Sequence, residues 1–256
     1  MKEDNPHHLS TLIPHHSTSA NSLPRVLLFD IDGTLIRAAR RPEYRGLIHG
    51  MLTDIFGTCG RIAEVDFAGR TDLSIYREAL ECEGITMQVI RERLPLIEKR
   101  MVEILHSLSE TGTVFYLCRG VRELLDAIQN EAEKFLPSLL TGNVESLAEA
   151  KLRHVDIWHY FKGRGAFGSD DENRDHLPAI AAERLSEHSG LAIAPEQFII
   201  IGDTPRDIAC ARHFGAKVLA VATGVHSVEQ LSACAPDAVL KDLNDTEQVL
   251  NLLNEI

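Results

Sequence analysis

Short apolar runs that end abruptly in small or polar residues are the feature that most constrains the fold of this chain. The first run, Val26–Phe29, stops at Asp30. An apolar run of this kind is typical of a parallel strand that is buried on both faces. Later runs of the same kind are Leu136–Leu140, Arg164–Phe167, Phe198–Ile201 and Lys217–Ala222, and helical patterns follow them at 144–155, 175–188, 205–214 and 227–233. The alternation predicts an α/β fold with a parallel sheet and helices on both faces.

The charge of the chain restricts its partners. Lys and Arg number 26 and Asp and Glu number 38, so the formal net charge of the 256 residues is −12. Phosphate backbones and anionic membranes repel such a chain, and we therefore expect neither nucleic acid nor membrane as a partner. An anionic substrate would need a metal or a few local cations to offset this repulsion.

Cysteine usage and the N-terminal residues bear on location. The five cysteines, at 59, 82, 118, 210 and 234, form no CxxC pair. This argues against a disulfide framework or a zinc ribbon and favours a reducing, cytoplasmic location. No apolar run is long enough to span a bilayer, and the N-terminus lacks the continuous apolar segment of a secretory signal. We expect residues 1–24, rich in His, Ser, Thr and Pro, to form a mobile tail.

A helical region interrupts the alternation after the first strand. Residues 37–111 show helical patterns at about 40–56, 72–82 and 87–109, and we expect no strand among them. They are predicted to form a cap domain over the strand ends. Residues 25–36 and 112–256 would form a Rossmann-like catalytic core, and ligands bind such sheets at the carboxyl ends of the strands.

Three polar motifs follow separate predicted strands. They are Asp30-Ile31-Asp32-Gly33-Thr34-Leu35, Thr141-Gly142-Asn143 and Gly202-Asp203-Thr204-Pro205-Arg206-Asp207. In order and spacing they resemble the motifs of the haloacid dehalogenase (HAD) superfamily, and the resemblance covers about residues 25–225. It implies a Mg²⁺-dependent phosphohydrolase that works through an aspartyl-phosphate.

The resemblance assigns separate roles to the two carboxylates of the first motif. Asp30 would attack phosphorus, and Asp32 would protonate the leaving alcohol and later activate water. Gly33 would permit the tight turn that brings both carboxylates to one cavity. Taken alone, the two aspartates could instead cap a following turn.

The second motif offers groups that bind phosphate. The hydroxyl of Thr141 and the backbone N–H groups of Gly142 and Asn143 precede a predicted helix, and a helix N-terminus readily binds an anion. The alternative is an ordinary helix cap, because Thr and Asn are common there. The two roles are compatible.

The last motif offers metal ligands. The resemblance implies that Asp203 binds Mg²⁺ together with the Asp30 carboxylate and the backbone carbonyl of Asp32, a set of hard oxygens that this ion prefers. Asp207 would ligate through water or orient the other ligands. Simple capping of the following helix is the alternative for both Asp203 and Asp207.

The basic residue of the remaining motif departs from the Lys-Pro that is frequent in the superfamily, because no Lys-Pro occurs here. We favour Arg174, just before the predicted helix 175–188, as the residue that holds the phosphate and the nucleophile. Lys151, in the helix after the second motif, is the other candidate and is expected to contact phosphate. Arg offers two parallel N–H donors and Lys a single point charge, so Arg in place of Lys would hold the phosphate in a different way.

One loop of the predicted cap resembles that of phosphoglycolate-phosphatase-like members. It reads Phe67-Ala68-Gly69-Arg70-Thr71-Asp72. Arg70 would contact an anionic substrate when the cap closes. The alternative is a glycine turn followed by a helix cap at Thr71 and Asp72.

These observations together predict a Mg²⁺-dependent phosphatase that acts on a small phosphorylated metabolite, such as phosphoglycolate or a sugar phosphate. A phosphomutase of the same superfamily and a non-catalytic binding protein on this scaffold remain alternatives. A dehalogenase is disfavoured by Asp32, since cleavage of a carbon–halogen bond leaves no alcohol to protonate. The sequence gives no indication of the oligomeric state.

Overall fold

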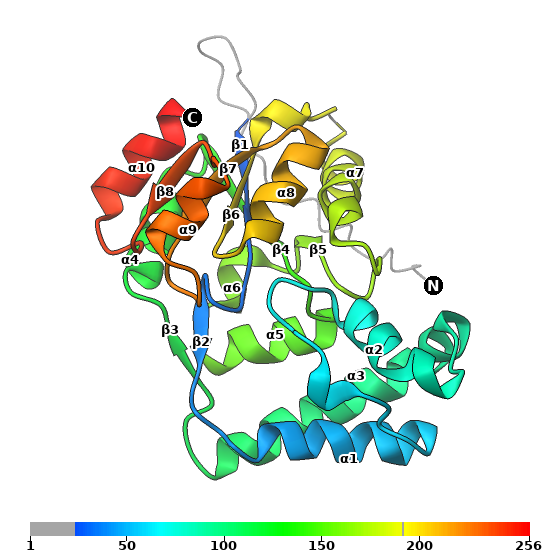
Figure 1. The fold of residues 1–256 in the computed structure, drawn as a ribbon. Coiled ribbons are helices and arrows are strands. Elements are labelled where there is room, and N and C mark those ends of the chain that lie inside the picture. The colour runs from blue at the N-terminus through cyan, green and yellow to red at the C-terminus, as the bar shows by residue number, and fades with distance from the viewer. Residues whose placement is uncertain (1–23, 191) are drawn as a thin grey trace, which may run out of the picture.

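The computed structural model describes residues 24–190 and 192–256 and has the α/β architecture that the sequence predicts. Six parallel strands form one sheet in the order β5-β4-β1-β6-β7-β8 (Figure 1). Except for residue 24, the predicted N-terminal tail lies outside the described residues. The strands are β1 (Arg25–Phe29), β4 (Phe135–Leu140), β5 (Gly165–Ala166), β6 (Phe198–Gly202), β7 (Lys217–Val221) and β8 (Ala238–Leu240).

Strand β1 lies inside the sheet, between β4 and β6, and its side chains fill both faces. Leu27 and Phe29 belong to one apolar cluster, whereas Val26 and Leu28 belong to the other, and all four are fully buried. Successive side chains of a strand point to opposite faces. The strand is therefore apolar throughout, without the alternation of a half-exposed strand.

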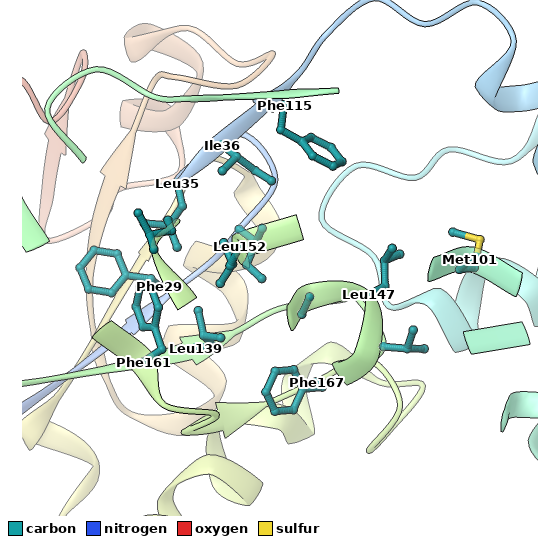
Figure 2. Close-up of a cluster of buried hydrophobic side chains, with 14 of the residues drawn as sticks. Phe29, Leu35, Ile36, Met101, Phe115, Leu139, Leu147, Leu152, Phe161 and Phe167 are labelled. Atoms are coloured by element: carbon teal, nitrogen blue, oxygen red, sulfur yellow. The ribbon is translucent and has the colours of Figure 1, made fainter. Parts of the chain in front are cut away.

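Helices cover both faces of the sheet, as predicted. On the face of Phe29 they are α4 (Val121–Asn130), α5 (Glu145–His154), α6 (Trp158–Phe161) and α10 (Thr246–Glu255). On the other face they are α7 (Leu177–Ser189), α8 (Pro205–Phe214) and α9 (Val228–Ala233). The ring of Phe29 meets that of Phe161 edge to face, with centroids 5.9 Å apart (Figure 2). This geometry is a favourable one for aromatic pairs.

The inserted helical region lies between two short strands, β2 (Ile36–Ala38) and β3 (Phe115–Leu117), which pair antiparallel. Its helices are α1 (Tyr44–Phe56), α2 (Asp72–Leu80) and α3 (Met87–Glu110), and they lie beyond the carboxyl edge of the sheet (Figure 1). Helix α3 packs against α5 of the core. The apolar cluster of Phe29 continues without a break into the insertion, as far as Met101 (Figure 2).

The structure corrects the sequence prediction in places. The expectation of no strand within 37–111 was wrong for Arg37 and Ala38, which belong to β2. A strand of three residues is too short to show a periodicity, and the same holds for β3 and β8. Single turns of 3₁₀ helix occur at Ile62–Glu64, Glu81–Glu83, Arg174–His176 and Pro195–Gln197. Within the described ranges, no helix has the length and apolar character needed to cross a membrane.

Candidate active site

The carboxyl ends of the neighbouring strands β4, β1 and β6 deliver polar residues to one place. Phe29 pairs with Leu139 of β4 and with Ile201 of β6, so the three strands end nearly level. The backbone N–H of Asp30 donates to the carbonyl of Ile201 at 2.9 Å and extends this pairing by one residue. Asp30 and Asp203 are 5% and 3% exposed, so the sheet presents two buried carboxylates at its edge.

Asp30, Asp203 and Asp207 form a buried carboxylate cluster, in which one oxygen of each lies within 4.8 Å of the others. Burial raises the pKa of Asp30 to about 7, although Arg174 opposes the shift. Burial also raises the pKa of Asp203 to about 8, and the neighbouring carboxylates add to that effect. Closely spaced buried carboxylates resist ionisation unless cations compensate them, so this cluster has the character of a cation site.

Arg174 supplies one such cation. Its Nη2 donates to Oδ1 of Asp30 at 2.9 Å and to Oδ1 of Asp207 at 2.6 Å. Burial alone lowers the pKa of the guanidinium, but the two carboxylates outweigh it and raise that pKa above its usual range. The Nε of Arg174 is buried and has no hydrogen-bond partner. The structure therefore brings the favoured basic candidate against the predicted nucleophile.

Asp207 is engaged through both carboxylate oxygens. Oδ1 accepts from Arg174, while Oδ2 accepts from the backbone N–H of Thr204 at 3.0 Å and from its hydroxyl at 2.7 Å. Thr204 and Asp207 form a capping box at the start of α8. Because these bonds occupy both oxygens, the contacts favour a role in orienting Arg174. Metal ligation by Asp207 through water stays a prediction.

The second carboxylate of the first motif has its own partners. Oδ2 of Asp32 accepts from Lys151 Nζ and from Asn143 Nδ2, each at 2.7 Å, and Lys151 Nζ also donates to Asn143 Oδ1 at 2.6 Å. The Asp32 side chain is 45% exposed, whereas that of Lys151 is 9% exposed. Burial lowers the pKa of Lys151, but Asp32, Tyr44 and Asp72 together outweigh burial and the net shift is upward. The two basic candidates thus serve different carboxylates, Arg174 on Asp30 and Lys151 on Asp32.

Two glycines of the motifs lie at positions that have no room for a side chain. Gly33 has a φ of +95°, and a Cβ there would lie 2.4 Å from an oxygen of Asp203. This agrees with the tight turn expected after the two aspartates. At Gly142 a Cβ would lie 1.8 Å from the carbonyl oxygen of Arg70. The sequence pointed to phosphate binding at Gly142, but the contact with the inserted region is a finding of the tertiary structure.

Arg70 faces its own helix in this structure. It forms an ion pair with Glu78, and its Nη2 donates to the carbonyl oxygen of Ser74 at 3.1 Å. The hydroxyl of Thr71 accepts from the backbone N–H of Ser74 at 3.2 Å and caps α2. These contacts match the alternative of a glycine turn and a helix cap. Contact between Arg70 and substrate stays a prediction.

Other polar residues of the site were not singled out from the sequence. Thr34 Oγ1 donates to Oδ1 of Asp203 at 3.2 Å, and Thr223 Oγ1 donates to the carbonyl oxygen of Gly33 at 2.6 Å. Thr34 belongs to the first motif, so its position was a usable signal. Thr223 follows β7, and only the strand order brings it to Gly33.

Comparison with known proteins agrees with this fold and relates the chain to a group of hydrolases. A family model described as "HAD-hyrolase-like" matches residues 175–246. Phosphoglycolate phosphatase of Pseudomonas putida is 23% identical over 223 residues, which span 87% of this chain and 78% of that protein. The phosphoglycolate phosphatase of Escherichia coli K12 is 28% identical over 166 residues, 63% of this chain and 61% of that protein.

Solved structures share the fold over nearly the whole chain. A predicted phosphoglycolate phosphatase from Haemophilus somnus superposes with a TM-score of 0.59 at 18% identity, covering 90% of this chain and all of that one. A putative β-phosphoglucomutase from Thermotoga maritima gives 0.54 at 22% identity, covering 91% and 99%. At these identities the likeness concerns the fold.

The parallel sheet, the helical insertion after its first strand and the buried aspartates define a HAD-like hydrolase. Within that class the chain is related at about 25% identity to the phosphoglycolate phosphatases over most of its length.

Proposed function

We propose that this protein is a phosphatase that hydrolyses a small organophosphate monoester through an aspartyl-phosphate on Asp30 and that it requires Mg²⁺. The observation that carries the proposal is that two carboxylates, two residues apart in the sequence, contact different cations. Asp30 is buried against Arg174, while the more exposed Asp32 is held by Lys151 and Asn143. The curated relatives make 2-phosphoglycolate the first substrate to test.

The donor set fits Mg²⁺. Asp30 and Asp203 are buried carboxylates whose charge is only partly compensated by cations. With the backbone carbonyl of Asp32 they would form the set of hard oxygens that the resemblance implies. No His or Cys belongs to the cluster that the described residues form. Bound there, Mg²⁺ would supply positive charge to the transferring phosphoryl group.

The chain's own residues then account for the chemistry. A carboxylate oxygen of Asp30 bonds to phosphorus as the bond from phosphorus to the alcohol oxygen breaks, and Asp32 gives that oxygen its proton. Asp32 next takes a proton from water, whose oxygen bonds to phosphorus and releases inorganic phosphate and free Asp30. Arg174 holds Asp30 in place, while Lys151 and Asn143 hold Asp32.

The proposed setting is the cytoplasm. All five cysteines are free, which is the usual state in a reducing compartment. The net charge of −12 supports a small metabolite as the partner and disfavours nucleic acid and anionic membranes.

The experiment separates the two carboxylates by mass spectrometry of the intact protein after incubation with p-nitrophenyl phosphate and Mg²⁺. Asp32→Asn keeps the nucleophile but loses the group that activates water, so it should accumulate a covalent phosphate. Asp30→Asn should show none. A phosphate adduct in both variants, or one mapped by fragmentation to another residue, would overturn the assignment.

A further inference from the structure

The start of helix α2 lies directly on the loop that follows strand β4. The backbone N–H of Asp72 donates to the carbonyl of Gly142 at 2.7 Å, and Asp72 Oδ2 accepts from the backbone N–H of Val144 at 2.8 Å. The hydroxyl of Thr71 donates to the carbonyl of Glu172 at 2.7 Å. The inserted region is thus joined by hydrogen bonds to the core at the second motif.

Helix α5 has no cap of its own. Its N-cap residue is Val144, whose side chain cannot accept a hydrogen bond. Asp72 supplies the missing carboxylate from a different part of the chain, where the helix dipole also favours a negative group. The helix capped in this way carries Lys151, and Asn143 precedes it directly. Both of these side chains hold Asp32.

The buried position of the Asp72 carboxylate makes its ionisation less favourable. Burial raises the pKa of Asp72 to about 6, and the bond from Val144 and the charge of Lys151 only partly offset it. The neighbouring carboxylates of Asp32 and Glu98 raise that pKa further. Asp72 also lies in the first turn of α2, where the helix dipole favours a carboxylate. Its hydrogen bond with Val144 is the contact that reaches across to the core.

We infer that Asp72 is a positioning residue that couples the seating of the inserted helices to the geometry of Asp32. The inference rests on the proposed function of Asp32 as the acid and base of phosphate-ester hydrolysis. With the insertion seated, Asp72 caps α5 and fixes Asn143 and Lys151, which hold Asp32. When α2 lifts away, the backbone N–H of Val144 loses its acceptor, and the segment that holds Asp32 is fixed less firmly.

The experiment compares Asp72→Ala with Asp72→Asn, whose amide oxygen can still accept from Val144. Thr86→Ala is the matched control, because Thr86 caps α3 within the insertion by accepting from the N–H of Val89. Amide hydrogen exchange at Val144 reports the cap without any assay of activity. Steady-state kinetics with 2-phosphoglycolate and p-nitrophenyl phosphate report Asp32, since an aryl leaving group needs little protonation.

We expect exchange at Val144 to quicken about fivefold to thirtyfold in Asp72→Ala, the factor that follows from losing one helix cap. The kcat for 2-phosphoglycolate should fall by up to the same factor. The fall with p-nitrophenyl phosphate should be smaller. Asp72→Asn should restore most of both properties, and Thr86→Ala should change neither.

Several results would overturn the inference. These are unchanged exchange at Val144 in Asp72→Ala, equal losses with both substrates, or an Asp72→Asn variant as impaired as the alanine variant. A wild-type protein that hydrolyses neither substrate would instead overturn the proposed function, while the exchange measurement would still decide whether Asp72 caps α5.

Discussion

Replacing Arg174 by Met removes the one side-chain cation that contacts the buried carboxylate cluster among the described residues. Its Nη2 bonds both Asp30 and Asp207, and the arginine side chain is only 7% exposed. Methionine fills similar space without charge. The variant therefore leaves three neighbouring carboxylates of the cluster with no partner guanidinium, in a place that water can hardly enter.

The expected loss follows from the burial of this pair. Breaking a buried ion pair by removing one partner costs about 3–5 kcal/mol in the free energy of unfolding, which corresponds to about 6–20 °C in Tm for a chain of this size. The loss should depend on pH. Burial raises the pKa values of Asp30 and Asp203 to about 7 and 8, so at pH 5 both are largely neutral and need no cation. At pH 8.5 both are largely ionised, and the gap between variant and wild type should be greatest.

The assay is thermal unfolding in EDTA at pH 5 and at pH 8.5, followed by calorimetry or dye fluorescence. Arg153→Met is the control, since Arg153 pairs with Glu149 and the two side chains are 63% and 39% exposed. A surface pair of this kind contributes about 0–1 kcal/mol, so the control should shift Tm little at either pH. Two results would show that Arg174 does not compensate the charge of the buried carboxylates. In one, Arg174→Met unfolds at the wild-type temperature at pH 8.5; in the other, it loses as much stability at pH 5 as at pH 8.5.

Two further predictions concern the metal and the boundary with the insertion. In EDTA the wild-type Tm should fall as pH rises from about 4 to about 8, because the folded state holds protons on Asp30 and Asp203 more tightly than the unfolded chain. Mg²⁺ should restore the Tm at pH 8. A Tm that changes with neither pH nor Mg²⁺ would contradict the predicted metal site. Gly142→Ala should lower kcat/KM about a hundredfold with little change in the circular dichroism spectrum, because its Cβ displaces the Arg70 backbone by an ångström or more. Near-normal kinetics in that variant would show that the close contact is not needed for activity.

Local patterns in the sequence were sufficient to predict the core of the fold. The run Val26–Phe29 is apolar at every position because β1 is buried on both faces, and this signal needs no knowledge of distant residues. Motifs at the strand ends likewise predicted which residues meet, since the carboxyl ends of parallel strands share one edge. The three-residue strands were not predicted, because so short an element shows no periodicity of apolar residues.

The resemblance favoured Arg174 as the partner of Asp30, but only the tertiary structure shows that Lys151 contacts Asp32. Arg174 is 144 residues from Asp30 and Lys151 is 119 residues from Asp32, and no local pattern tells which base meets which acid. Lys151 lies on α5, after β4, and Arg174 lies in the segment after β5, so both come from the same side of β1. The way these two segments pack at the end of β1 decides which acid each base contacts. The cap that Asp72 gives to α5 has the same origin. It depends on where the inserted helices rest, and packing against the core determines that position.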